Sequence, residues 1–148
     1  MNINTAHRTS VSPVMSLDEL RAFMKREFPQ LGDAFEVVAV DEGSATMRLH
    51  ADEQHLRPGG TVSGPSLFAL ADVAAYAAIL AHIGPVALAV TTNLNINFLR
   101  KPSPGTVEAM ARLLKLGKRL AVLDISLTDG ASGELVAHAT ATYSIPPR

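Results

Sequence analysis

An almost unbroken run of apolar residues from Leu67 to Ile83 constrains this 148-residue chain more than any other feature. The run follows Pro65, is rich in alanine, and is closed by Gly84 and Pro85. Proline is favourable at the first position of a helix, and glycine followed by proline ends one. A helix that is apolar on nearly every side must be covered on most of its circumference. We therefore expect one long buried helix over residues 65–82, in a soluble protein rather than in a membrane.

The segments around this helix alternate between apolar and polar residues, which predicts strands. The expected strands cover residues 35–40, 44–51, 90–99, 107–116, 120–128 and 134–145. Short turns connect the last four, so we expect these to form an antiparallel meander. A buried helix beside a run of strands makes an α+β fold in which an antiparallel sheet wraps around the long central helix. One sheet leaves open edges, so a symmetric dimer is expected to complete the burial.

The N-terminal part of the chain predicts a flexible tail over residues 1–15, followed by a single domain over residues 16–148. Ser16 is placed to cap a short amphipathic helix, Glu19 occupies the capping-box position, and Pro29 ends the pattern. The tail has no apolar run of the kind found in signal peptides. The chain has no cysteine, which excludes disulfides and a thiol nucleophile and is consistent with a cytoplasmic location.

Composition and charge narrow the possible partners. Hydrophobic residues make up 47% of the chain and charged residues 18%, and the formal net charge is -1. Such a balance is typical of a globular protein and gives no reason to expect nucleic acid or an anionic membrane as a partner. An anionic ligand would need a local basic cluster. The two candidates are Arg100 with Lys101, and the turn that holds Lys115, Lys118 and Arg119, although either could simply be a solvated turn.

Asp72 is the polar exception inside the apolar helix. It lies about two turns from the helix start, too far to act as an N-cap. An ionised carboxylate in an apolar setting is costly unless it is hydrogen-bonded, and such groups are frequent at functional sites. The alternative is a structural role, in which Asp72 binds neighbouring backbone or its own counterpart across a dimer. The residue pattern alone favours neither interpretation.

The start of the same helix is the second candidate site. Gly64 would let a ligand approach the backbone closely, and the N–H groups of a helix start point outward. This is the geometry that an oxyanion hole requires, although Gly64 and Pro65 could simply begin the helix. His55, in the preceding loop, is the histidine expected closest to Asp72, although the alternative is an ordinary solvated loop residue. The sequence supports neither a Ser-His-Asp arrangement nor a metal site.

The stretch GGTVSGPSLFALAD at residues 59–72 resembles the helix motif of PaaI-type hotdog thioesterases, in the superfamily of the 4-hydroxybenzoyl-CoA thioesterases. Residues 90–100 resemble the strand that follows the helix in this family, residues 116–121 its next hairpin, and residues 133–143 its last strand. The resemblance covers residues 16–145 in order. It implies a hotdog fold, hydrolysis of acyl-CoA thioesters without a metal or redox cofactor, and homodimers or dimers of dimers.

The resemblance also implies roles for individual residues. Asp72 would activate water or attack the thioester carbonyl, Gly64 would donate its backbone N–H to the oxyanion, and Thr91 would help to orient the water. Further substrate contacts are expected from His55, Arg57, Ser63, Pro65 and Asn93. Contacts with CoA are expected from Arg100, Lys115, Gly117, Lys118, Arg119 and Leu120.

The chain departs from the family pattern at three positions. Ser63 replaces a histidine, Pro65 replaces a glycine and has no N–H to donate, and Arg57 replaces an asparagine. These departures motivate an alternative, a hotdog protein that binds acyl-CoA without hydrolysing it. A hydratase or dehydratase on the same fold would need an Asp and a His in one short loop motif, which the sequence lacks. A purely structural assembly protein is the third alternative.

Overall fold

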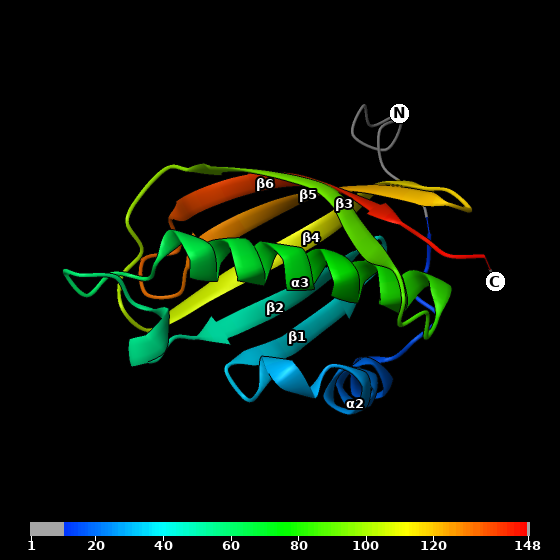
Figure 1. The fold of residues 1–148 in the computed structure, drawn as a ribbon, viewed down its shortest axis with the longest axis horizontal. Helices are drawn as coiled ribbons and strands as arrows, with labels where there is room; N and C mark the ends of the chain where they lie inside the picture. Colours follow the sequence, from blue (N-terminus) through cyan, green and yellow to red (C-terminus); the bar gives the residue numbers. More distant parts are fainter. Residues whose placement is uncertain (1–10, 148) are drawn as a thin grey trace.

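The central helix α3 spans Gly64–Ile83 and lies along one face of a six-stranded antiparallel sheet (Figure 1). The computed structural model describes residues 11–147. Helix α3 is long and apolar enough to cross a membrane, yet 72% of its most apolar window is buried by the rest of the chain. Gly84 ends it with a φ of 96°, and its N–H donates to the Leu80 carbonyl at 2.9 Å. A side chain would strain this backbone conformation, which explains the glycine.

The sheet confirms the α+β hotdog architecture expected from the sequence. Its strands are β1 (Phe35–Asp41), β2 (Ser44–His50), β3 (Val90–Phe98), β4 (Thr106–Leu116), β5 (Leu120–Asp129) and β6 (Leu135–Ser144). Their order across the sheet is β1-β2-β4-β5-β6-β3, and every neighbouring pair is antiparallel. The buried apolar residues of these strands and of α3 form one common core.

The position of β3 corrects the expected four-strand meander. Strands β4, β5 and β6 do form a meander, but β3 pairs with β6 at the sheet edge opposite β1 (Figure 1). Leu94, Ile96 and Phe98 lie opposite alanines of β6, whose small side chains leave room for them. The seven residues 99–105 then return across the end of the sheet to β4. Alternation within one strand predicts its two faces but not its neighbour.

Helix α2 (Leu17–Glu27) covers β1 and begins with the predicted capping box. Glu19 N–H donates to the Ser16 hydroxyl at 3.1 Å, and Ser16 N–H donates to the Glu19 carboxylate at 2.9 Å. A short 3₁₀ helix, η1 (Pro29–Leu31), follows. Of the predicted tail, residues 1–10 lie outside the described part of the chain. At its other end, the N–H groups of residues 14 and 15 donate to the Ala81 carbonyl of α3, at 2.7 and 3.1 Å.

Candidate active site

Asp72 lies half-buried on α3 with one carboxylate oxygen held by two hydroxyl groups. The Thr91 hydroxyl donates to Asp72 Oδ1 at 2.5 Å, and the Tyr143 hydroxyl donates to the same oxygen at 2.7 Å. Within residues 11–147, no side chain or backbone group donates to Oδ2. The carboxylate is therefore fixed through one oxygen and offers the other to a ligand.

A bulge in β3 places Thr91 on the helix-facing side of the sheet. The register of β3 against β6 shifts between Thr91 and Asn93, where Thr91 lies opposite Tyr143 and Asn93 opposite Thr142. In a regular strand, Thr91 and Asn93 would share one face. The extra residue turns Thr91 to the face that carries Tyr143, so both hydroxyls reach α3.

Tyr143 is the site residue that the sequence analysis missed. Its side chain is 3% exposed, and its hydroxyl also lies 2.9 Å from the backbone carbonyl oxygen of Asp72. Burial raises the pKa of Tyr143, and the negative charge of Asp72 raises it further. The hydroxyl therefore keeps its proton at neutral pH and remains a donor. From sequence, Tyr143 is an ordinary inward-facing aromatic residue at the end of β6, because only the register against Thr91 reveals its partner.

A cavity of about 540 Å³ opens beside Asp72, and we call it the Asp72 cavity. Tyr76, one turn further along α3, forms part of its wall and donates its hydroxyl to the Ala87 carbonyl at 2.8 Å. Phe28 stands edge-on to Tyr76, with 6.0 Å between the ring centroids. The described lining contains no basic side chain. The complete lining is Glu27, Phe28, Gln30, Asp72, Val73, Tyr76, Ala87, Ala89, Val90, Thr91 and Tyr143.

A second cavity of about 550 Å³ lies at the start of α3, and we call it the helix-start cavity. Gly64 and Pro65 form one side of it, and Arg57, Arg100 and Lys101 contribute positive charge. A methyl group built on the Gly64 Cα would lie 3.4 Å from the Phe98 ring, so the ring packs directly over this glycine. In the described part of the chain, the Gly64 N–H has no acceptor. It is therefore free to donate to a ligand oxygen.

The remaining residues at the helix start have structural contacts. Ser63 caps α3: its hydroxyl accepts from the Ser66 N–H at 3.3 Å and donates to the Ser66 hydroxyl at 2.9 Å. His55 is buried in the short 3₁₀ helix η2 (Glu53–His55), where its Nδ1 accepts from the Asp52 N–H at 3.0 Å. It lines neither the Asp72 cavity nor the helix-start cavity. Its carbonyl accepts from Ser63 N–H, so it shapes the loop before α3.

Within one chain, Asp72 and Gly64 are too far apart to act on the same carbonyl group. They are eight residues apart on one helix, which corresponds to about 12 Å along its axis. They also line different cavities. A reaction that uses both groups therefore needs one of them from another copy of the chain.

The remaining predicted contacts lie at separate places on the sheet. Asn93 is exposed, accepts a hydrogen bond from the Asn95 amide at 3.1 Å, and lines neither cavity. Arg100 lies at the helix-start end, with its Nε 3.8 Å from the Glu134 carboxylate. The β4–β5 hairpin carries Lys115, Gly117, Lys118, Arg119 and Leu120 at the opposite end, where Leu120 and Val90 flank Ser144. The basic group of Arg100 and Lys101 and the basic group of the β4–β5 hairpin thus lie at opposite ends of one chain.

In the part of the chain that the structure describes, metal ligands do not gather at either cavity. Within the described residues, no three His, Asp or Glu side chains lie close enough to hold a metal ion.

Comparison with known proteins places this geometry in a family. Residues 59–136 match the model of the thioesterase superfamily. A candidate thioesterase structure from Silicibacter sp. TM1040 is 52% identical, with a TM-score of 0.86 over 94% of this chain and 97% of that one. A mutant structure of the phenylacetic acid degradation protein PaaI from Thermus thermophilus is 28% identical, with a TM-score of 0.67 over 84% of this chain and 99% of that one.

A curated relative has a named activity. The 1,4-dihydroxy-2-naphthoyl-CoA hydrolase of Listeria monocytogenes is 31% identical over 94 residues, which are 64% of this chain and 76% of that protein. The matched segment 59–136 begins before α3 and runs into β6, so it includes the helix with Gly64 and Asp72 and the strand with Thr91. The chain belongs to the thioesterase superfamily as a PaaI-type hotdog protein, and its reaction class is thioester hydrolysis.

Proposed function

We propose that this protein hydrolyses acyl-CoA thioesters, with Asp72 as general base or nucleophile and the Gly64 N–H as oxyanion donor. The observation that carries the proposal is the asymmetric anchoring of Asp72, which lines the Asp72 cavity and whose Oδ1 accepts from Thr91 and Tyr143 while Oδ2 has no donor among the described residues. A carboxylate fixed in this way can take a proton from water or attack a carbonyl carbon directly. The hydrolysis then yields a free acid and CoA.

The placement of Asp72 and Gly64 at two separate cavities supports a two-fold dimer formed along β3. This edge strand carries an exposed apolar residue at each end, with Val90 56% exposed beside the Asp72 cavity and Phe98 54% exposed beside the helix-start cavity. In an antiparallel pairing of two β3 strands, the Val90 end of one copy meets the Phe98 end of the other. Asp72 of one copy would then face the helix-start cavity of its partner, and each dimer would hold two equivalent sites.

The same pairing accounts for the distribution of charge. The helix-start cavity contains Arg57, Arg100 and Lys101, whereas the described lining of the Asp72 cavity contains only acidic charges. The phosphates of CoA would bind at the basic helix-start cavity of one copy. The acyl group would then extend past Asp72 of the other copy into the Asp72 cavity. The basic β4–β5 hairpin lies at the Val90 end, the end that the partner's Arg100 and Lys101 would approach. The relative from Listeria is a hydrolase of a CoA thioester.

The first experiment is a thiol-release assay with a panel of aliphatic and aromatic acyl-CoAs, with Asp72→Asn as the matched variant. We expect the wild type to release thiol and the variant to lose about 10²–10⁴-fold in kcat, the usual contribution of a positioned base. The variant should keep the fold, because its amide oxygen can still accept from Thr91 and Tyr143. Full activity in a folded Asp72→Asn variant would refute the assignment.

The alternative of a non-catalytic acyl-CoA binder predicts a different outcome. It is favoured by Pro65, which has no N–H with which to assist Gly64 at the oxyanion. Such a protein would bind acyl-CoA in a titration and release no thiol from any member of the panel.

A further inference from the structure

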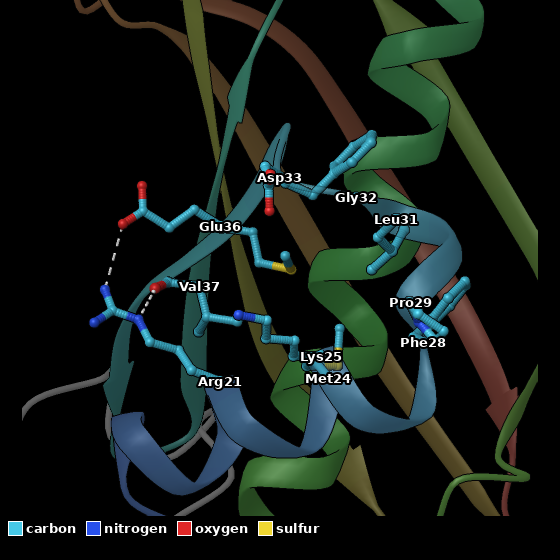
Figure 2. Close-up of a pocket in the computed structure, with 12 residues that line it drawn as sticks. Arg21, Met24, Lys25, Phe28, Pro29, Leu31, Gly32, Asp33, Glu36 and Val37 are labelled. Atoms are coloured by element: carbon cyan, nitrogen blue, oxygen red, sulfur yellow. Dashed lines mark hydrogen bonds and ion pairs between the residues drawn. The ribbon is translucent and has the colours of Figure 1, made fainter.

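Phe28 separates the Asp72 cavity from a third cavity. This third cavity, of about 590 Å³, lies between α2, η1 and β1, and we call it the α2–β1 cavity (Figure 2). Among the described residues, Phe28 alone lines both cavities. In Figure 2, Phe28 and Pro29 lie on one side of the α2–β1 cavity, and Arg21 and Glu36 lie on the other.

The backbone of Phe28 is fixed on both sides. Its N–H donates to the Met24 carbonyl at 2.8 Å, and its carbonyl accepts from the Leu31 N–H at 3.2 Å. Pro29 follows directly and restricts the Phe28 backbone further. The ring is half-buried and stands edge-on to Tyr76. The backbone of Phe28 is therefore held in place, and its ring forms a fixed partition between the two cavities.

The Asp72 cavity leads from the carboxylate towards this partition. Tyr76 is four residues beyond Asp72, about 6 Å further along α3, and the Phe28 ring packs against it. A group that extends from a thioester carbonyl at Asp72 along this helix face would thus reach Phe28. The α2–β1 cavity begins on the other side of that ring.

The interior of the α2–β1 cavity suits an aliphatic chain. Its buried lining consists of the apolar side chains of Met24, Val37 and Met47. At its rim, Arg21 donates to the Val37 carbonyl at 2.8 Å and to the Glu36 carboxylate at 3.5 Å. Lys25 and Asp33 also lie in the lining, while the buried surface is apolar and therefore favours a hydrocarbon chain in the interior.

We propose that Phe28 determines the length of the acyl group, and that the α2–β1 cavity is an extension of the acyl pocket, blocked by the Phe28 ring, with room for an aliphatic tail. The inference rests on the proposed function, because it takes the Asp72 cavity as the acyl side of the site. With Phe28 in place, compact acyl groups fit and long chains meet the ring. Removal of the ring joins the two cavities.

The test compares wild type with Phe28→Ala on straight-chain acyl-CoAs that range from short to long. We expect kcat/KM of the wild type to fall as the chain lengthens. In Phe28→Ala, the ratio of long-chain to short-chain kcat/KM should rise at least about tenfold, since each methylene that gains an apolar site favours binding by roughly threefold. The milder variant Phe28→Leu should change the ratio in the same direction and guards against misfolding of the alanine variant.

Two further variants isolate the role of the partition. Leu31→Ala enlarges the α2–β1 cavity and leaves the Phe28 ring in place, so the chain-length profile should stay that of the wild type. Phe28→Ala combined with Leu31→Trp refills the cavity, so the short-chain preference should return. An unchanged profile in Phe28→Ala, or an equal shift in Leu31→Ala, would overturn the inference.

A binding measurement separates this inference from the proposed function. Calorimetric titration with S-alkyl-CoA thioethers of increasing length reports chain-length preference without any hydrolysis. We expect Phe28→Ala to gain affinity for the long thioethers and the wild type to prefer the short ones, whether or not thiol is released from thioesters. The inference fails if both proteins show the same length dependence of the dissociation constant.

Discussion

At the scale of single residues, the two oxygens of Asp72 have different surroundings. Oδ1 accepts from two hydroxyls, one on β3 and one on β6, while Oδ2 has no donor among the described residues. Two donors from different strands fix both the position and the rotation of the carboxylate. A base or nucleophile held in this way loses little orientational freedom when the substrate binds.

Tyr143→Phe removes one of these donors and keeps the ring. We expect a loss of about 10–100-fold in kcat with little change in KM, because a hydrogen bond to a charged group contributes about 1.5–3 kcal/mol and, in the proposed reaction, this one orients the reacting carboxylate. Steady-state kinetics of the wild type and the variant measure the effect. Thr91→Val should behave similarly, and Thr91→Ser should retain most activity.

A double-mutant comparison separates positioning from a general structural role. If Tyr143 acts through Asp72, the substitution Tyr143→Phe should cost almost nothing further in an Asp72→Asn background. An equal loss in both backgrounds would show that Tyr143 only supports the fold.

Some of these residues were predictable and some were not. Asp72 stands out in the sequence because a carboxylate within an apolar helix is rare. Gly64 stands out through its place at the helix start. Tyr143 gives no such signal, because its role depends on register and on the β3 bulge, and both are tertiary features. His55 was expected near Asp72 from its position in the chain, but the capping contacts of η2 hold it elsewhere.

At the scale of elements, the helices follow their sequence signals closely, because caps and apolar periodicity act over a few residues. Ser16 with Glu19 begins α2 and Gly84 ends α3, as the sequence predicts. The strands were also predictable to within a residue or two at each end. The order of the sheet was not, because the partner of β3 is chosen by packing against β6 far along the chain.

Asp129 links two loops: residues 99–105, which connect β3 to β4, and the turn between β5 and β6. Its carboxylate accepts from the backbone N–H of Ser103 at 2.7 Å, of Ala131 at 2.8 Å and of Ser132 at 3.4 Å. The hydrogen bond from Ser103, and then those from the turn, hold the pKa of Asp129 below its ordinary value against the opposing effect of burial. The ionised form therefore stabilises the folded state.

We expect Asp129→Asn to lower the free energy of unfolding at pH 7 by about 1–3 kcal/mol, because an amide cannot accept from all three N–H groups. The stabilisation by the carboxylate is complete above the pKa of Asp129 in the unfolded chain, about 4, and is lost as the pH falls through the lower folded value. Urea unfolding at pH 7 and near pH 3 should show that the difference between wild type and variant shrinks in acid. A difference of equal size at both pH values would contradict this account.

At the scale of the whole molecule, the separation of Gly64 from Asp72 makes subunit mixing informative. In the proposed dimer, each site takes Asp72 from one copy and Gly64 from the other. Asp72→Asn removes the carboxylate, and Gly64→Val places a branched side chain against Phe98 and blocks the helix-start cavity. Each variant alone should therefore be nearly inactive.

When the two variants are dissociated, mixed and reassociated, half of the dimers should be hybrids with one fully wild-type site. Activity should recover to about one quarter of the wild-type value, as two-fold symmetry predicts. Thiol release before and after mixing measures the recovery, and a mixture of wild type with Asp72→Asn serves as the control. No recovery, with hybrids confirmed by native mass spectrometry, would place both groups of each site in one chain.

The pairing of β3 with β6 also sets the order in which the protein can assemble on a ribosome. Among the described strands, β3 has β6 as its sole neighbour, and β6 is the last of them in chain order. Thr91 and Asp72 therefore leave the exit tunnel well before the strand that aligns them. Until β6 emerges, the apolar side chains of the nascent β3 have no strand beside them, so this segment is the one most exposed to mispairing with other chains. Strand β6, which brings the Tyr143 hydroxyl to Asp72, is thus also the strand that gives β3 its partner.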